Sequence, residues 1–357
     1  MPQPRRASRP RAGAAQQRGA HGLTVAVTGP TGEIGKPALR ALDRAREVGR
    51  IVGMARRPFE PSAIGLSPKV EYQQGDVTRR EDVEALVEGA DVVVHLAFII
   101  IAGSELSRQV NIDGSRNVFE AAVAAEVKRV VYASSVAAYG FHADNPLPLT
   151  EEVPARGTEA HPYSAMKAAV EEVLHEVLDP SGVDAYVLRP CIVAGPHAQM
   201  LVTQVPYIRW GERLPRAVRR LLDTVPILRP VLPDPGVPFQ LVHHDDVASA
   251  LRAAVLGRGT PGVYNLAGDG EVRMRDLADE LGYSAIPVPE LAVDAAAQII
   301  ALLPFLPDEA TWIEAVRVPV VMDTAKARRE LRWRPRHDAR ETLHQTVAAA
   351  RGDFDPA

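Results

Sequence analysis

The sequence is poor in cysteine and has no long apolar run. A single cysteine, Cys191, stands among 357 residues, which excludes an intrachain disulfide and a cysteine metal cluster and leads us to expect a cytoplasmic setting. No segment approaches the roughly 18 apolar residues of a membrane span. The net charge of −4 gives no sign of a nucleic-acid or membrane partner. With 46% hydrophobic and 24% charged residues, the composition is that of an ordinary globular protein, and we expect a small-molecule substrate.

Acidic and large apolar side chains are missing from the start of the chain. The stretch "MPQPRRASRPRAGAAQQRGAHG" holds five arginines and no acid. Such a segment buries too little surface to offset its ordering entropy, so residues 1–22 are expected to form a disordered basic tail. An Arg-rich, acid-poor start also imitates a targeting peptide, and we assign it no function.

Short apolar runs alternate with helical patterns from residue 23 onward. The runs are "LTVAVTG", "RIVGMA", "VEYQQGD", "DVVVHLA", "RVVYASS" and "DAYVLRP". This alternation predicts an α/β protein with a parallel sheet, and the continuous apolar character fits strands buried on both faces. Proline-rich segments later interrupt this alternation of strand and helix patterns. It continues in "QLVHHDDVASALRAAVL" and "GVYNLAG". We expect a doubly wound domain at 23–197 plus 241–270, and a smaller, discontinuous C-terminal substrate-binding domain at 198–240 plus 271–350.

A glycine-rich turn follows the first apolar run directly. In "TGPTGEIG" the glycines are Gly29, Gly32 and Gly35, and a helical pattern comes next. This context predicts the dinucleotide-binding turn of a Rossmann fold. Gly29 would allow the tight turn, Gly32 would let the backbone approach a pyrophosphate, and Gly35 would let the helix pack closely on the strand. The helix N-terminus would supply free N–H groups and partial positive charge to the phosphates.

The second apolar run lacks an acid where one would select the cofactor. A carboxylate about 20 residues past the glycines would bind the adenosine ribose and favour NAD, but here Ala55 is followed by Arg56 and Arg57. A guanidinium can bind a 2′-phosphate bidentately, so we expect NADP in preference to NAD. The alternative is that both arginines cap a surface loop. Asp76, after the third run, either accepts a hydrogen bond from the adenine amino group or caps the helix expected near Arg80.

The order of these motifs resembles the extended short-chain dehydrogenase/reductase family, the group of NAD-dependent epimerases and dehydratases. The matching pieces are "TGPTGEIG", "GDV", "HLA", "VNIDGSRNV", "YASSVAAYG", "YSAMK", "RPCIVAGP" and "LVHHDDVASA", with a weaker match at "MDTAKARRELRWRP". The resemblance implies a Rossmann domain, a small C-terminal domain and NAD(P)-dependent catalysis. It implies Tyr163 as the catalytic acid/base, Lys167 as its partner and Ser135 as the hydroxyl that holds the substrate oxygen, with Ser134 as the lesser candidate.

The same resemblance implies a cofactor site and a pair of subunits. Leu96 and Ala97 would line the adenosine side, Asn111 would head a helix and order the site, and Pro190 would lie near the nicotinamide. Helices at 111–126 and 161–179 pair subunits in many relatives, which implies a homodimer. The full set expected at the cofactor is Gly29, Thr31, Gly32, Glu33, Ile34, Gly35, Arg56, Asp76, Val77, Leu96, Ala97, Asn111, Ser134, Lys167 and Pro190.

Tyr163 and Lys167 have the spacing that acid/base chemistry requires. Four residues apart on a helix, they lie on one face. Free tyrosine has a pKa near 10 and is mostly neutral at pH 7, whereas an ammonium about 4 Å away at an effective dielectric of about 20 is worth about 4 kcal/mol. We therefore expect Lys167 to lower the pKa of Tyr163 toward the range where general acid/base work is efficient, and Ser135 to polarise the substrate oxygen.

Ile192 departs from the family's pattern. Family members that act on nucleotide sugars commonly have Asn at this position, and an aliphatic side chain cannot make the same hydrogen bond. The apolar "FIII" just past the fourth run also favours a fairly apolar carbonyl or alcohol substrate for hydride transfer, although core packing explains part of it. One alternative is a nucleotide-sugar epimerase or dehydratase using tightly bound NAD, which arginines in 209–229 could serve. A second is a catalytically silent NADP-binding regulator, against which the retained Ser135, Tyr163 and Lys167 argue.

Two further features are interpreted as structural. The "HHDD" of residues 243–246 looks like a set of metal ligands. In the family, however, the Asp before "VA", here Asp246, caps a helix, so no metal is expected. Cys191 is expected to lie semi-buried beside the cofactor, without a role as a nucleophile.

Overall fold

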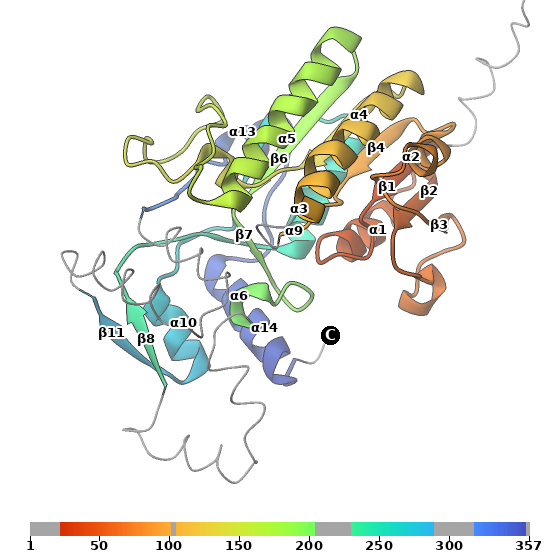
Figure 1. Cartoon of the computed structure of the whole chain (residues 1–357). Helices are drawn as coiled ribbons and strands as arrows, with labels where there is room; N and C mark the ends of the chain where they lie inside the picture. Colours follow the sequence, from red (N-terminus) through yellow and green to blue (C-terminus); the bar gives the residue numbers. More distant parts are fainter. Residues whose placement is uncertain (1–21, 101–104, 204–229, 289–317, 355–357) are drawn as a thin grey trace, which may run out of the picture.

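A seven-stranded parallel sheet forms the centre of the protein (Figure 1). The computed structural model describes residues 22–100, 105–203, 230–288 and 318–354. From one edge to the other, the strands of the sheet are β10 (Gly262–Leu266), β6 (Asp184–Pro190), β5 (Arg129–Ala133), β4 (Val92–His95), β1 (Leu23–Thr28), β2 (Val48–Ala55) and β3 (Val70–Gln74).

Helices cover both faces of this sheet. One face carries α1 and α9, which contact each other, and the other carries α4 between α2 and α5. Because both faces are covered, the strands are apolar without alternation, and Val92, Val93 and Val94 are all fully buried. The helices of this unit are α1 (Gly35–Asp43), α2 (Arg80–Val87), α3 (Glu105–Arg108), α4 (Gly114–Ala124), α5 (Pro162–Leu178) and α9 (His244–Val255).

The strand order reverses between β1 and β4. Strands β2 and β3 lie on one side of β1, and β4, β5, β6 and β10 lie on the other. Thr28, the last residue of β1, pairs with Met54 in β2 and with His95 in β4, so the carboxyl ends of these strands are level. In open α/β sheets, ligands bind outside the carboxyl ends at such a reversal. The doubly wound α/β class is confirmed, and the reversal between β1 and β4 is the point where this class would bind a ligand.

A smaller unit packs beyond the end of the sheet. Its parallel strand pair lies against α10, which packs in turn on α14 (Figure 1), around a separate core that includes Leu232, Leu277 and Leu343. Two short strands, β7 and β9, form the parallel pair that leads toward it. The elements of this part are β7 (Ile192–Ala194), α6 (Met200–Thr203), β8 (Val231–Asp234), β9 (Leu241–His243), α10 (Met274–Leu281), β11 (Ser284–Pro287) and α14 (Ala339–Arg351).

The C-terminal part of the chain is shared between the two units. Helix α13 (Ala325–Glu330) contacts β10, and Leu331 and Trp333 lie in the core of the large sheet, although 271–350 was assigned to the second domain. The domain limits therefore stay a prediction. The basic tail and the arginines in 209–229 lie outside the described residues. Within the described ranges, no helix is both long and apolar enough to cross a membrane.

Candidate active site

The glycine turn joins β1 to α1 in a conformation that two of its glycines require. Gly29 has φ +67°, and its N–H donates to the Met54 carbonyl at 3.0 Å. A Cβ on Gly29 would lie 2.8 Å from the Ala97 nitrogen, and one on Gly35 would collide with the Gly29 carbonyl. A Cβ on Gly32 would meet only the Gly29 oxygen, at 3.5 Å. Gly29 and Gly35 are thus required because neighbouring backbone leaves no room for a side chain, whereas the space beside the Gly32 backbone is open.

This turn fits a dinucleotide. The crevice side of Gly32 is the place where a side chain would stand between a pyrophosphate and the backbone N–H groups. Helix α1 begins at Gly35 without an acidic residue in its first turn, so its N-terminal partial charge is available to an anion. Thr31 and Ile34 are partly exposed in the turn and Glu33 is exposed. Leu96 and Ala97 lie against Gly29, and their place beside the adenosine stays a prediction.

A buried chain of hydrogen bonds fixes the ends of β1 and β4. The Thr28 hydroxyl bonds His95 Nδ1 at 2.7 Å, and the Ser115 hydroxyl bonds His95 Nε2 at 2.8 Å. Burial lowers the pKa of His95 to about 3, so the ring is neutral. Ser115 donates to the Asn111 carbonyl, and Thr28 accepts the N–H of Ala97. One tautomer satisfies the whole chain, with Thr28 donating to Nδ1 and Nε2–H donating to Ser115.

Asn111 orders the segment that follows β4. It lies in a π-helical turn, Gln109–Asp113, between α3 and α4 and is fully buried. Its amide oxygen accepts the Ile99 N–H at 2.8 Å, and its amide nitrogen donates to the Ile99 carbonyl at 2.9 Å. Asn111 thus clamps Ile99, and its role in ordering a catalytic site stays a prediction. Contact with a cofactor stays a prediction.

Tyr163 and Ser135 meet at the carboxyl end of β5. Ser135 follows β5 and begins a 3₁₀ turn, where its hydroxyl accepts the Ala137 N–H at 3.2 Å. Tyr163 lies in the first turn of α5, whose N-cap is His161, and is partly exposed. Burial raises the pKa of the Tyr163 phenol, and a hydrogen bond with Ser135 lowers it by less. The structure thus brings together the two hydroxyls that the resemblance paired.

Lys167 lies below them and faces the sheet. It is 4% exposed, and its Nζ donates to the Ala133 carbonyl at 2.9 Å. The same Nζ stands 3.8 Å from the centroid of the Phe98 ring and 5.9 Å from that of Tyr163. Burial lowers the pKa of Lys167 to about 7, against the charge of Glu171, which raises it.

The expected lowering of the pKa of Tyr163 is wrong for this state of the molecule. Desolvation of the phenol outweighs its hydrogen bond with Ser135, and the Lys167 ammonium directs its short contact to the main chain of β5 rather than to the phenol. The spacing correctly placed Tyr163 and Lys167 on one helix face. It could not show that Phe98 lies next to both, with its ring 5.6 Å from that of Tyr163.

Ser134 points away from the place where substrate chemistry would occur. Its hydroxyl donates to the buried carboxylate of Glu171, which is held in turn by the guanidinium of Arg189 through bonds of 3.0 and 2.5 Å. The three side chains are 4%, 1% and 3% exposed. Neither Glu171 nor Arg189 was predicted to belong to the site. The only signal was the position of Glu171, which is one helical turn after Lys167.

The remaining predicted cofactor residues lie along the same edge of the sheet. Arg56 and Arg57 are exposed just past β2. Asp76 does not cap α2, whose N-cap is Arg79; its carboxylate accepts both the N–H and the hydroxyl of Thr78 at 2.9 Å. The Asp76 carboxylate thus caps a local turn, and α2 begins only at Arg80, three residues after the position that Asp76 would cap.

Val77 and Pro190 are more deeply placed. The Val77 side chain packs in the core against Gly114, and its carbonyl accepts from an asparagine amide on α4. Pro190 is buried at the end of β6. Cys191 is buried as well, 6% exposed, and burial raises the pKa of its thiol.

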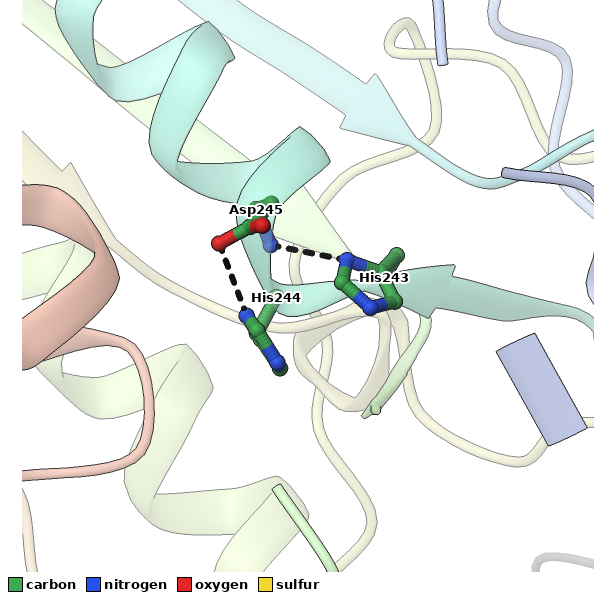
Figure 2. Close-up of side chains that lie close together, drawn as sticks. All are labelled: His243, His244 and Asp245. Atoms are coloured by element: carbon green, nitrogen blue, oxygen red, sulfur yellow. Dashed lines mark hydrogen bonds and ion pairs between the residues drawn. The ribbon is translucent and has the colours of Figure 1, made fainter. Parts of the chain in front are cut away.

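The imidazoles of His243 and His244 lie next to Asp245 at the start of α9 (Figure 2). Ligand atoms of the three residues lie within 4.8 Å of one another. His243 Nδ1 caps the helix by accepting the Asp245 N–H at 3.2 Å, and His244 Nδ1 bonds the Asp245 carboxylate at 3.0 Å. The Nε2 atoms of both rings are buried without a hydrogen-bond partner. A metal on His243 Nε2 would need the proton on Nδ1, where the backbone already donates, so these contacts favour a structural role.

Asp246 does not cap α9, contrary to expectation. His243 provides the cap, and the fully buried Asp246 carboxylate instead accepts the N–H groups of Arg336 and His337 at 3.0 and 3.1 Å. Asp246 is the third residue of the helix. Its side chain points away from the helix axis toward the backbone of Arg336 and His337, 90 and 91 residues further along the chain. It ties the C-terminal segment to α9.

A cavity of about 650 Å³ reaches the Glu171–Arg189 ion pair but is not lined by Ser135, Tyr163 or Lys167. It lies between α5 and the loop before α5, and the helix residues that line it include Ala165, Ala168 and Glu172. At 3.6 residues per turn these side chains stand on the face of α5 opposite Tyr163 and Lys167. The chemistry would therefore occur at the strand ends rather than in this cavity.

Comparison with known proteins agrees with this geometry. The model of the NAD dependent epimerase/dehydratase family matches residues 25–267. An uncharacterized Sinorhizobium fredii protein, y4nG, is 29% identical over 338 residues, which cover 90% of this chain and 77% of that protein. The human 3 beta-hydroxysteroid dehydrogenase type 7 is 32% identical over 168 residues, 43% of this chain, and the match spans 44% of that protein's length.

Solved structures share the fold. The dTDP-glucose 4,6-dehydratase DesIV from Streptomyces venezuelae, with NAD bound, superposes with a TM-score of 0.68 at 23% identity over 93% of this chain and 98% of its own. The UDP-glucuronic acid 4-epimerase from Bacillus cereus, in complex with NAD, gives 0.69 at 17% identity over 92% and 99%. With the family model matching most of its length, the chain belongs to the NAD dependent epimerase/dehydratase family and is an enzyme of the extended short-chain dehydrogenase/reductase type.

Proposed function

We propose that the protein transfers hydride to or from the carbonyl or alcohol carbon of a fairly apolar small molecule, with Tyr163 as its acid/base. The observation that carries this proposal is the convergence of Ser135, Tyr163 and Lys167 at the carboxyl end of β5, beside the ring of Phe98. A nicotinamide, when bound, supplies or accepts the hydride. The residues of the chain supply the proton and hold the oxygen.

The proton moves through Tyr163. In the reductive direction the hydride adds to the carbonyl carbon, the phenol gives its proton to the oxygen, and solvent reprotonates the phenolate. Ser135 shares the oxygen and donates to it as negative charge develops there. The Lys167 ammonium, with Nζ 5.9 Å from the centroid of the phenol ring, would favour the phenolate as it forms, against the desolvation that raises the pKa of the resting phenol. In the oxidative direction the same groups act in reverse.

Apolar side chains support the choice of substrate. Ile192 is 39% exposed just beyond β6, and Ile100 is 42% exposed in the segment after β4. Exposed aliphatic side chains at the carboxyl edge favour a ligand that buries them. The steroid dehydrogenases among the relatives, at 29–32% identity over part of their length, support a substrate of this class. Sterols and other polycyclic secondary alcohols or ketones are therefore the first compounds to test.

The proposed cofactor preference is for NADP. Ala55 ends β2 where a carboxylate would exclude a 2′-phosphate, and Arg56 is exposed immediately after it. No ion pair engages Arg56 or Arg57 among the described residues. Their guanidinium groups are thus available to a phosphate.

The test is a substrate panel with both cofactors. Steroid and terpenoid alcohols and ketones are incubated with NADP, NADPH, NAD or NADH, and formation or loss of the reduced nicotinamide is followed by absorbance. Turnover of an apolar member, abolished by Tyr163→Phe with cofactor binding retained, supports the proposal. Turnover at near-normal rate in Tyr163→Phe refutes the acid/base role. Thermal stabilisation by UDP- or dTDP-sugars alone favours the epimerase alternative, and cofactor binding without turnover of any compound favours the silent regulator.

We also propose a homodimer. The contacting helices α4 and α5 cover one face of the sheet, and the family resemblance implies that these helices pair subunits. Light scattering on the purified protein tests this directly. A mass near the 38.6 kDa of one chain at micromolar concentration would refute the proposal.

A further inference from the structure

A buried ion pair lies directly behind Lys167. Glu171 follows Lys167 by one turn of α5 and is 1% exposed. Arg189, near the end of β6, bonds both oxygens of its carboxylate, with Nε at 3.0 Å and the terminal nitrogen at 2.5 Å. The guanidinium also donates to the Val153 carbonyl at 3.3 Å and lies 4.2 Å from the centroid of the Tyr139 ring. Every part of the pair is therefore held in place.

The Glu171–Arg189 ion pair gives Ser134 a structural role. Its hydroxyl donates to Glu171 Oε1, the oxygen that Arg189 Nε also contacts. Its N–H donates to the Leu188 carbonyl at 2.8 Å. Ser134 is thus fixed from both its backbone and its side chain, and the next residue, Ser135, is the one left to face Tyr163. The Ser134 hydroxyl therefore has a structural role, and the Ser135 hydroxyl is the one available to the reaction.

The pair also sets the charge environment of Lys167. The groups packed around its ammonium are Tyr132 from β5, His95 from β4, and Tyr163 and Glu171 from its own helix. His95 is neutral because its pKa is about 3, and burial raises the pKa of Tyr132 well above its usual range. Glu171 is therefore the one acidic side chain among these described neighbours, and its charge raises the pKa of Lys167. It opposes the desolvation that otherwise drives the proton off Lys167.

We propose that Glu171, anchored by Arg189, is a positioning residue that favours the charged form of Lys167 and turns Ser135 toward Tyr163 by holding Ser134. The proposal rests on the proposed function in one respect, since it takes Lys167 and Tyr163 as the acid/base pair. It adds two residues, Glu171 and Arg189, to the apparatus. Neither touches substrate; both act through Lys167 and Ser134.

The ionisation of Lys167 can be measured without a substrate. The chain contains five lysines, so a protein carrying ¹³C at lysine Cε gives few signals, and the one lost in Lys167→Arg belongs to Lys167. Its chemical shift is followed against pH in the wild type and in Glu171→Gln. The matched control is Glu172→Gln, which removes the same charge from the exposed neighbouring position on α5.

Glu171→Gln is expected to lower the pKa of Lys167 by about 1 to 2 pH units. This is the shift expected from loss of a full charge about 6 Å away at an effective dielectric of about 20. Glu172→Gln is expected to leave the Lys167 titration unchanged, because water screens its charge. If the two variants titrate alike, or if Lys167 in folded Glu171→Gln titrates as in the wild type, the proposal is wrong.

A second variant covers the case in which Glu171→Gln does not fold, since it leaves Arg189 buried without a partner. Glu171→Met with Arg189→Met removes both charges and keeps the volume. Because Glu171 is nearer to Lys167, the pKa of Lys167 is still expected to fall, and an unchanged value overturns the proposal. These readouts need no turnover, so a failure of the substrate panel leaves them intact. If turnover is found, the basic limb of its pH profile is expected to move in Glu171→Gln by the amount measured for Lys167.

Discussion

Gly32→Ala is the substitution that separates cofactor binding from folding most cleanly. A methyl group on Gly32 would meet no atom closer than the Gly29 oxygen at 3.5 Å, an ordinary contact, and the residue has no positive φ. The stability of the variant is therefore expected to stay within about 0.5 kcal/mol of the wild type. The methyl group would, however, stand between the bare backbone of the turn and a pyrophosphate.

The expected loss of cofactor affinity follows from the contact that the methyl group prevents. A hydrogen bond between a backbone N–H and a charged group is worth about 1.5–3 kcal/mol, which corresponds to roughly a 10- to 150-fold increase in Kd. Isothermal titration calorimetry with NADP and NAD measures this, and urea unfolding without cofactor measures stability. The two measurements are independent. The predicted result is a variant with a normal free energy of unfolding and a raised Kd for both NADP and NAD.

Substitutions of two other glycines serve as controls, because both are expected to lower the stability that Gly32→Ala should leave unchanged. Gly35→Ala would push its Cβ into the Gly29 carbonyl and should destabilise the protein itself. Gly89→Ala lies in open space at φ +70°, before the amino end of β4, so it should cost about 1–2 kcal/mol of backbone strain and leave cofactor affinity unchanged. If Gly32→Ala bound NADP and NAD as tightly as the wild type, the placement of the pyrophosphate over this turn would be refuted.

Three further predictions test other parts of the structure. Arg56→Ala should raise the Kd for NADP about 10- to 100-fold, the value of one charge-assisted pair, with the Kd for NAD little changed; equal effects on both in calorimetry would count against the NADP preference. Burial lowers the pKa of Lys167 from 10.5 to about 7. Between pH 7 and 10, the unfolded chain therefore keeps a proton on Lys167 that the folded chain has released. The free energy of unfolding of the wild type, measured with urea and compared with that of Lys167→Met, should rise with pH over this range. A flat difference would mean that Lys167 is not desolvated. Asp246→Asn should cost about 2–4 kcal/mol in urea unfolding, since it loses an acceptor for buried N–H groups, whereas Asp269→Asn, whose ion-pairing side chain is 65% exposed, should cost less than about 1 kcal/mol; equal costs would show that the C-terminal segment is not held by Asp246.

Local features of the chain were predictable, and they account for most of the fold. The apolar runs became the strands of the sheet because continuous burial needs continuous apolar sequence. The turn at Gly29 and Gly35 was predictable because a single backbone conformation demands glycine there. Tyr163 and Lys167 were placed on one face by helix geometry alone.

Contacts between distant segments were not predictable in the same way. Ser134, Glu171 and Arg189 join β5, α5 and β6, and none of the three is marked by its local pattern. Asp246 was expected to cap its own helix, yet its partners lie 90 and 91 residues further on. The pKa of Tyr163 was misjudged for a related reason. Spacing gives the distance between two side chains on a helix, but desolvation depends on everything else that packs around them.

One regularity of the strands links fold and site, and it was present in the sequence. Thr28 and His95 are the last residues of β1 and β4, Ser134 follows β5, and Arg189 stands next to the end of β6. All four are buried polar side chains at the carboxyl edge, where an apolar run of the strand ends. A buried polar group costs free energy unless its partners are supplied, so a sheet selected for stability alone would have no reason to gather them at one edge. Their position is explained if that edge must hold fixed dipoles and charges around a reacting oxygen, and a polar residue that ends an apolar run is then a signal for the active site that needs no motif.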